Sequence, residues 1–190
     1  MFYKFMRGVA RIVAFIWWNL KVKGKENIPD EGPLLIVSNH QSNFDPVAIA
    51  LQLKRPVHFL AKQELFKSKF GRWFFTKLMV IPVNRKEVSP RSVKDCIRVL
   101  RNKEVLGIFP EGTRVKDKPI KPMDGFVMFA VRTKSPILPV YVQGGMSFRS
   151  RFEVTIGEPF ELSEYYGEKL KPEKLGEISQ KVMDNIYQLK

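Results

Sequence analysis

Short apolar runs, separated by polar turns and by segments with helical periodicity, make up most of this 190-residue chain. Five of the runs have the length and the composition of buried β-strands. They cover residues 34–37, 56–61, 105–109, 136–142 and 152–156. Helical patterns fit between several of them, which is the alternation that builds α/β folds. We predict a single α/β domain with a mixed, mostly parallel sheet flanked by helices.

Three segments within this domain carry helix signals. Ser89 can cap a helix that begins at residue 90, with apolar positions 93, 96, 97 and 100 on one side. Residues 126–132 indicate another helix. Apolar positions spaced from 175 to 189 predict a terminal helix that closes one side of the sheet.

A polar segment with a histidine and an aspartate follows the first predicted strand. It runs from Asn39 to Asp45 and leads into a helical pattern at 47–53. Such strand-to-helix turns are where open α/β sheets hold their ligands. An imidazole can accept a proton near neutral pH, and a carboxylate can fix its tautomer, so His40 and Asp45 are a candidate base and its orienting partner. The alternative is a hydrogen bond within the loop, or a helix cap.

A second polar turn, residues 109–114, follows the strand predicted from residue 105. In a parallel sheet the two turns lie at the same edge and can face one cleft. Gly112 would let the backbone approach a ligand, and Arg114 offers a planar fork suited to phosphate. Glu111 offers an acceptor for a hydroxyl or a cation. Taken alone, this turn could also be a surface β-turn with an ion pair.

Together these residues resemble the glycerolipid acyltransferase family, in particular the 1-acylglycerol-3-phosphate acyltransferases, over about residues 23–157. Four blocks occur in the family's order. The second block is Ile81–Arg85, the fourth is the proline-bearing strand 136–140, and the third is Phe-Pro-Glu-Gly-Thr-Arg at 109–114 without substitution. The first block comprises Asn39, His40, Ser42 and Asp45. Two positions depart from the family's pattern: Val115, where the family commonly has serine, and Asp124, where lysine is frequent. These departures leave the identity of the acceptor headgroup open, but not the class of reaction.

The resemblance implies transfer of an acyl group from an acyl thioester to the free hydroxyl of 1-acylglycerol-3-phosphate, giving phosphatidic acid for phospholipid biosynthesis. His40 would act as the general base, assisted by Asp45, and the hydroxyl would attack directly without an acyl-enzyme. The acyl donor would be acyl-CoA or acyl-acyl carrier protein, and no bound cofactor or metal is expected. A neighbouring acceptor, such as dihydroxyacetone phosphate or another lysophospholipid, stays open.

The resemblance also implies which residues bind the acceptor. Arg114 and Arg85 would hold its phosphate, while Glu111, Gly112 and Thr113 would shape the glycerol site. Lys62, just past a strand, could help through its charge or its backbone amide, or be an ordinary exposed lysine. The loop itself would be oriented by Asn39 and Ser42.

The positive net charge favours a polyanionic partner but does not show which kind. The chain has 33 Lys and Arg against 19 Asp and Glu, a formal net charge of +14. Residues 1–152 hold 28 basic and 11 acidic side chains, whereas 153–190 hold 5 and 8. A basic body attracts lipid surfaces and nucleic acids alike.

The N-terminus favours lipid, because residues 1–22 predict an amphipathic helix preceding an acyltransferase domain at 23–190. Its longest apolar run, Ile12 to Trp18, is far shorter than the roughly 20 residues that span a bilayer. We expect the helix to lie on an anionic membrane, peripheral or monotopic, at the cytoplasmic face. Lys4, Arg7 and Arg11 fall opposite an apolar side of Phe2, Phe5, Met6, Val9, Val13, Ile16, Trp17 and Leu20.

Residues at the end of this predicted helix and just past it extend the predicted membrane contact. Trp17 and Trp18 suit the headgroup level, with Lys21, Lys23 and Lys25 just beyond. The alternative is that the apolar side packs on the domain core. Residues 66–77 are also aromatic and basic, so part of this segment could line an entrance for an acyl chain, although burial would explain at least half of its aromatics.

Other chemistries find little support in the sequence. There is no Gly-x-Ser-x-Gly elbow, Walker loop or dinucleotide glycine fingerprint. Two histidines and one cysteine are too few for a structural zinc site, and a single cysteine excludes an intrachain disulfide. Cys96 and His58 are interpreted as structural. A basic nucleic-acid-binding domain and a membrane-binding protein without activity are the remaining alternatives, although no nucleic-acid partner is expected.

Overall fold

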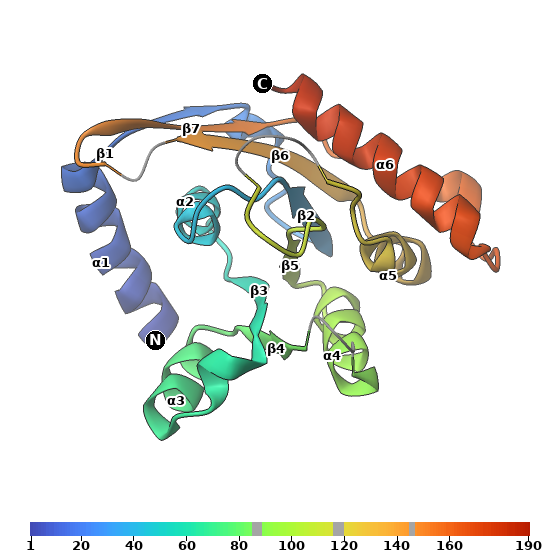
Figure 1. Ribbon diagram of the computed structural model, residues 1–190, viewed down its shortest axis with the longest axis horizontal. Coiled ribbons are helices and arrows are strands. Elements are labelled where there is room, and N and C mark those ends of the chain that lie inside the picture. The colour runs from blue at the N-terminus through green and yellow to red at the C-terminus, as the bar shows by residue number, and fades with distance from the viewer. Residues whose placement is uncertain (85–88, 116–119, 145–146) are drawn as a thin grey trace.

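A computed structural model describes residues 1–84, 89–115, 120–144 and 147–190 (Figure 1). Its strands form one seven-stranded sheet in the order β1-β7-β6-β2-β5-β3-β4, and all neighbours are parallel except β6 and β7. The strands are β1 (Trp18–Lys23), β2 (Leu34–Ser38), β3 (Val57–Lys62), β4 (Ile81–Val83), β5 (Val105–Ile108), β6 (Ile137–Gly144) and β7 (Ser150–Ile156). The predicted mixed, mostly parallel α/β sheet is confirmed.

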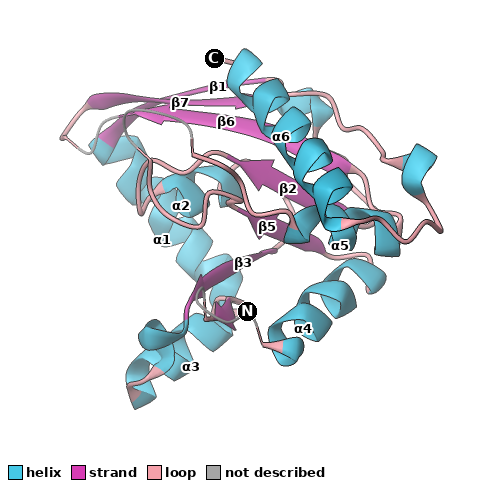
Figure 2. Ribbon diagram, turned by 45° about the vertical axis from the view of Figure 1, so that its right-hand side comes forward, coloured by secondary structure: helices cyan, strands magenta, loops and turns pink. Residues whose placement is uncertain are grey.

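Helices cover both faces of the sheet (Figure 2). They are α1 (Phe2–Trp17), α2 (Asp45–Ala50), α3 (Lys69–Lys77), α4 (Pro90–Arg101), α5 (Gly125–Thr133) and α6 (Pro172–Gln188). Strand β2 lies in the middle, and all five of its residues are buried because alternate side chains enter different cores. Leu35 and Val37 join the core beneath α4, α5 and α6, whereas Leu34 and Ile36 join the one beneath α1 and α2.

The five predicted strands are present as β2, β3, β5, β6 and β7, and α6 closes one face of the sheet as expected. The predicted helix over residues 1–22 is too long, because α1 ends at Trp17 and residues 18–23 form β1. From Trp18 onward apolar and polar residues alternate, which is the two-residue period of a strand. β1 pairs in parallel with β7, and Leu20 lies beside Phe152 instead of on the helix.

Trp18 also differs from expectation, since its side chain belongs to the core and not to a membrane headgroup level. It is 5% exposed, and its ring lies 5.0 Å from Phe44 and 5.6 Å from Phe152. Trp17, by contrast, is 43% exposed. The start of β1 therefore fixes the end of α1 to the domain.

Polar side chains of α1 hold this helix on the domain. Arg7 donates hydrogen bonds to the carbonyls of Leu53 and Lys54, at 2.7 and 2.9 Å, so it does not lie on a solvated face as the wheel predicted. The Tyr3 hydroxyl accepts a hydrogen bond from the Val57 amide at 3.1 Å. Most of the apolar side faces outward, against the alternative that it packs on the core. Its exposed members are Phe5, Val9, Val13, Ile16 and Trp17, and Ile12 and Phe15, which the wheel did not assign to this side, are exposed as well.

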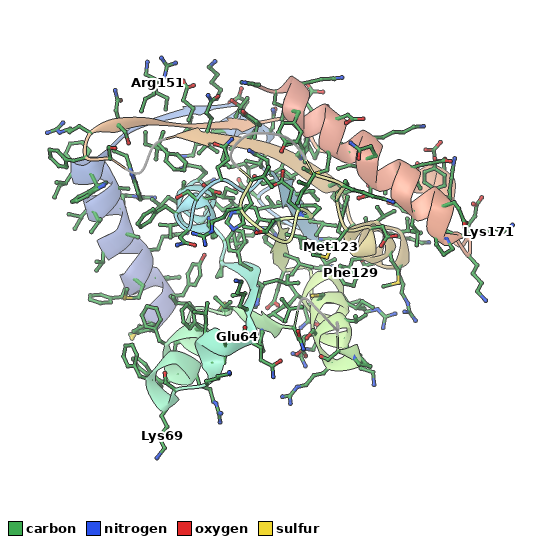
Figure 3. All side chains as sticks on the ribbon, viewed as in Figure 1. Glu64, Lys69, Met123, Phe129, Arg151 and Lys171 are labelled. Carbon is green, nitrogen blue, oxygen red and sulfur yellow. The ribbon has the colours of Figure 1, made fainter. Side chains whose placement is uncertain are left out.

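The aromatic segment around α3 is divided between core and surface. Phe66 is buried, whereas Phe70 is 69% exposed and Trp73 is 49% exposed. Lys69 points away from the molecule at the start of α3 (Figure 3). Phe2 of α1 packs edge-on against Trp73, with ring centroids 5.2 Å apart, so the two helices share one exposed apolar surface. Within the described residues, no helix is both long and apolar enough to cross a bilayer.

Candidate active site

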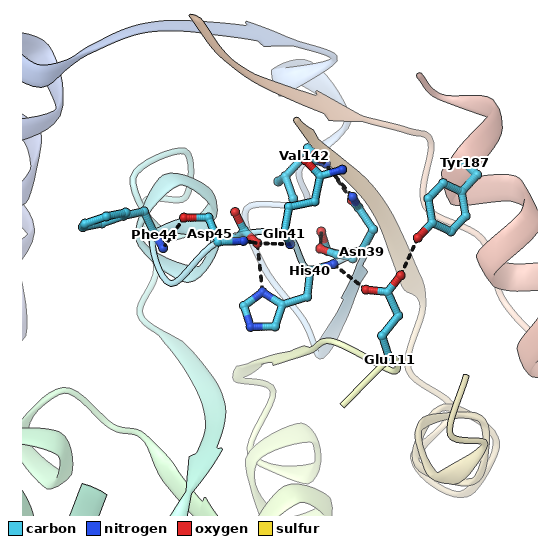
Figure 4. A network of polar contacts seen from close by, with 10 residues as sticks. Asn39, His40, Gln41, Phe44, Asp45, Glu111, Val142 and Tyr187 are labelled. Atoms are coloured by element: carbon cyan, nitrogen blue, oxygen red, sulfur yellow. Dashed lines mark hydrogen bonds and ion pairs between the residues drawn. The ribbon is translucent and has the colours of Figure 1, made fainter. Parts of the chain in front are cut away.

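The loop after β2 is folded around the carboxylate of Asp45, the first residue of α2 (Figure 4). The side chain is 1% exposed. Its Oδ2 atom accepts hydrogen bonds from the amides of Gln41 and Ser42, both at 2.7 Å, and lies 2.8 Å from His40 Nδ1. Since a carboxylate only accepts, Nδ1 carries the hydrogen and Nε2 keeps its lone pair.

The His40 imidazole is also fixed from one side by aromatic rings. It stacks on Phe109, with centroids 4.3 Å apart and planes 24° apart, and Phe109 stacks in turn on Phe59. The side chain of His40 is 12% exposed. No described residue hydrogen-bonds Nε2, so this nitrogen is available to a substrate hydroxyl. A held imidazole with one accessible basic nitrogen can act as a general base.

The second polar turn holds the backbone of the same histidine. The His40 amide donates to Glu111 Oε2 at 2.7 Å, and the His40 carbonyl accepts from the Val115 amide, also at 2.7 Å. β2 and β5 are adjacent and parallel, which brings the ends of both strands to one edge. The expectation that the two turns meet is therefore confirmed.

Glu111 is a buried carboxylate with both oxygens bonded to the protein. It is 4% exposed, and its second oxygen, Oε1, accepts a hydrogen bond from the hydroxyl of Tyr187 in α6 (Figure 4). Burial raises the pKa of Glu111, and the hydrogen bonds from Tyr187 and the His40 amide partly oppose that rise. In this arrangement the carboxylate supports the His40 loop.

Two further residues of the first block hold the loop in place. Asn39 is 1% exposed, and its amide donates to the Val142 carbonyl at 2.9 Å and accepts from the Val142 amide at 2.8 Å. This pairing ties the end of β2 to β6. The Ser42 hydroxyl accepts from the Phe44 amide at 3.1 Å. Both contacts suit the orienting roles expected of Asn39 and Ser42.

The predicted acceptor-binding residues lie next to this loop or at the same sheet edge. Gly112 has a φ of +63°, and a Cβ there would come within 2.0 Å of the Met123 methyl group, so glycine suits this turn. Thr113 and Arg114 are exposed, and no hydrogen bond or ion pair joins Arg114 to another described residue. Lys62 is exposed at the end of β3. Arg85 lies outside the described residues.

Three contacts of the site were not predicted from the sequence: the stacking of Phe109, the Val115 amide and the Tyr187 hydroxyl. Phe109 and Val115 belong to or adjoin the third block, which was the only signal available for them. Tyr187 lies in a different element and carries no motif. In the described parts of the chain, no three His, Cys, Asp or Glu side chains gather in a way that could hold a metal ion.

Comparison with known proteins identifies the class to which this fold and site belong. Residues 19–143 match the family model described as Acyltransferase, and the chain belongs to this family. The chain is 32% identical over 170 residues to the 1-acyl-sn-glycerol-3-phosphate acyltransferase of Bacillus subtilis, covering 86% of this chain and 84% of that protein. It is 26% identical over 200 residues to the enzyme of the same name from Streptococcus pneumoniae, covering 100% and 73%.

The fold is similar to that of a solved member of the same class. The crystal structure of the 1-acyl-sn-glycerophosphate (LPA) acyltransferase PlsC from Thermotoga maritima has a TM-score of 0.74 and 27% sequence identity. The similarity covers 98% of this chain and 79% of that one. The family predicted from the four blocks, and the fold class with it, are therefore confirmed.

Proposed function

We propose that this chain transfers a fatty acyl group from an acyl thioester to the free hydroxyl of 1-acylglycerol-3-phosphate, giving phosphatidic acid for phospholipid biosynthesis. The observation that carries the proposal is the His40–Asp45 pair, 2.8 Å apart, in a chain whose relatives include enzymes named for this reaction. The pair lies at the carboxyl end of β2, which is parallel to β5, and next to an exposed arginine, Arg114. Base and phosphate ligand are thus carried by adjacent turns.

The reaction needs only one nitrogen of His40. Nε2 takes the proton of the acceptor hydroxyl as its oxygen attacks the thioester carbonyl carbon, and Asp45 stabilises the imidazolium that forms. The carbon–sulfur bond then breaks, and the same proton passes to the departing thiolate. General-base help of this kind contributes roughly 10²–10⁴ in rate. Coenzyme A and acyl carrier protein both qualify as the thiol carrier.

Acceptor binding falls to the turn after β5. The guanidinium of Arg114 would hold the phosphate, joined by Arg85, while Gly112 and Thr113 line the path of the glycerol. A bidentate guanidinium suits a phosphate better than a single ammonium does. Lys62, exposed at the same edge of the sheet, adds positive charge nearby.

The membrane contact would be made by α1 and α3. Both helices expose apolar side chains, and a groove of about 840 Å³ lies between the start of α1 and the end of α3. Phe44, within the His40 loop, is also 40% exposed. An interfacial helix of this kind would keep the enzyme peripheral or monotopic, at the cytoplasmic face.

The two histidines of the chain allow a matched test of the proposal. We would measure phosphatidic acid formation from lysophosphatidate with each acyl donor, in mixed lipid vesicles, for His40→Asn and for His58→Asn. His40→Asn should lower kcat by about 10²–10⁴-fold with unchanged thermal unfolding, while His58→Asn stays near wild type. A wild-type enzyme that acylates only other acceptors, or a His40→Asn enzyme retaining a tenth of the activity, would reject the proposal.

A further inference from the structure

We propose that Tyr187 is a positioning residue for acyl transfer, acting through Glu111 on the backbone of His40; this inference rests on the proposed function. Tyr187 belongs to α6, far along the chain from both polar turns, and none of the four sequence blocks contains it. Its hydroxyl is the donor that completes the hydrogen bonding of a buried carboxylate. The role is indirect, because the phenol bonds Glu111 and not the imidazole.

The phenol of Tyr187 is held in place before it meets Glu111. Its ring packs edge-on against Tyr141 of β6, with centroids 6.1 Å apart and planes 64° apart. Ile186, the preceding residue, is fully buried in the core shared by α4, α5 and α6. The hydroxyl therefore approaches Glu111 from an element that is itself fixed on the sheet, as Figure 4 shows.

The main chain of His40 is bonded on both sides, and Tyr187 supports one of them. Glu111 Oε2 accepts from the His40 amide, while the Val115 amide donates to the His40 carbonyl. Removing the Tyr187 hydroxyl would leave Glu111 Oε1 buried without its donor, a loss that a carboxylate relieves by turning or by binding a proton. Either response loosens the grip on the His40 amide. A shift of about 1 Å in a base can lower a rate about a hundredfold.

A matched pair of variants isolates this hydroxyl. Tyr187→Phe keeps the ring that packs on Tyr141 and removes only the oxygen. Tyr166→Phe removes an equivalent hydroxyl, which donates to Glu161 at 3.1 Å in an exposed pair outside the described site. Both variants keep the core residues of α6.

The first measurement is steady-state kinetics together with thermal unfolding. Tyr187→Phe should lower kcat about tenfold, since a base that is displaced or less often aligned slows the chemical step. KM for lysophosphatidate and for the acyl donor should stay within about twofold, because the hydroxyl bonds Glu111 and the proposed phosphate ligand is Arg114. Tyr166→Phe should match wild type. A kcat within twofold of wild type, or a change confined to KM, would overturn the proposal.

The pH profile adds a readout that loss of packing would not move. The charged and titratable groups that act on Glu111 are Tyr187, His40 and Asp45. The Tyr187 hydrogen bond lowers the pKa of Glu111, so its loss should move the acidic limb of kcat to higher pH. Tyr166→Phe should leave this limb in place. If the acidic limb does not move in Tyr187→Phe, Tyr187 does not act through Glu111, and the proposal is overturned.

A spectroscopic measurement separates this inference from the proposed function. With only two histidines, the imidazole ring protons give two sets of signals, assigned by His58→Asn. Tyr187→Phe should shift the His40 signals, and Tyr166→Phe should not. If the His40 signals shift in Tyr187→Phe but the wild-type protein does not acylate lysophosphatidate, the proposed function is rejected and the link from Tyr187 to His40 is kept. If the wild-type protein acylates lysophosphatidate, and Tyr187→Phe changes neither the His40 signals nor kcat, only the link from Tyr187 to His40 is rejected.

Discussion

Two buried carboxylates support His40, and they do so through different atoms. Asp45 holds the ring through Nδ1, whereas Glu111 holds the backbone amide. The first partnership is visible in the sequence, because both residues lie in one short loop. The second is hidden, because Glu111 is contributed by another turn and Tyr187 by another helix. The sequence therefore predicts the His40–Asp45 pair more readily than Glu111 and Tyr187, which hold the backbone of His40 in position.

The same limit applies to individual side chains at the surface. The third block predicts Arg114 as a phosphate ligand, and the structure leaves it exposed without a hydrogen-bonding or ion-pairing partner among the described residues. Burial and hydrogen bonding explain Glu111, Asn39 and Asp45, which are all at most 4% exposed. An exposed cation has no such structural role. Its function is visible only in binding.

Arg114→Ala should raise KM for lysophosphatidate about ten- to a hundredfold, because the phosphate loses a charge-assisted contact. Arg114→Lys should recover part of this loss, since lysine keeps the charge without the planar fork. Initial rates at varied acceptor concentration would measure both. Arg101→Ala, an exposed arginine at the end of α4, is the control. An unchanged KM in Arg114→Ala would exclude this residue from the phosphate site.

At the scale of elements, α1 shows what a helical wheel can and cannot predict. Most of the apolar residues that the wheel placed on one side are exposed, but Leu20 belongs to β1, and Ile12 and Phe15 are exposed as well. The role of the polar side was not predicted, because Arg7 donates hydrogen bonds to the carbonyls of Leu53 and Lys54 instead of facing solvent. A wheel assigns each residue to a side, but only the tertiary structure shows which side meets the protein. The boundary with β1 was missed for a related reason: the change from helical to strand period at Trp18 falls within one apolar run.

The exposed stripe gives a direct test of membrane binding. Replacing Phe5, Ile12 and Ile16 by serine should weaken binding to anionic vesicles more than a hundredfold, since burial of each such side chain contributes about 1.5–3 kcal/mol. Folding should be unaffected, because all three are more than half exposed. Vesicle co-sedimentation and thermal unfolding would measure the two effects.

The control for this test is a triple serine variant on the opposite helix, at Glu173, Glu177 and Lys181 of α6. These residues are exposed and lie on the other face of the sheet. The variant should bind vesicles as wild type does, or slightly better, because it removes two acidic side chains. Equal vesicle binding by the α1 variant and wild type would exclude α1 as the anchor.

For the molecule as a whole, His58 links stability to pH. It lies in β3, with Nε2 3.4 Å from a carboxylate oxygen of Glu104. Burial lowers the pKa of His58, and Glu104 only partly opposes this. As pH falls below the ordinary histidine range, the unfolded chain takes up a proton that the folded protein resists, so stability falls. Each unit of difference in pKa corresponds to about 1.4 kcal/mol.

Urea unfolding at pH 7.5 and pH 5 would measure this effect. Wild type should lose more stability over that interval than His58→Gln, and the difference between the two isolates the share of His58 from that of other groups. Glu104→Gln should lose more than wild type, because the opposing charge is gone. An equal loss in wild type and His58→Gln would contradict the assignment.

Across the whole chain, the prediction succeeded where local pattern and tertiary structure demand the same thing. β2 and β5 are short apolar runs because both faces of each strand are covered, so these two strands can be predicted from the sequence alone. The two polar turns follow from the parallel order of these strands. Strand β1 and the Tyr187 contact depend on partners distant in sequence, β7 and Glu111. The alternation in residues 18–23 is a short local signal that follows directly on a helix, and nothing local specifies the Tyr187 contact.

Helices α1 and α6, which lie on opposite faces of the sheet, also differ in charge. α1, with Lys4 and Arg11 exposed, covers one face, while α6 covers the other and belongs to the acidic segment 153–190, as their opposite positions in Figure 1 indicate. Helix α4, on the same face as α6, is basic, so the difference lies between these two helices and not between the two faces. Near an anionic bilayer, this difference favours an approach through α1 over one through α6 before any contact forms. This preference fades as salt is added, since ions screen it over about 10 Å at 0.1 M.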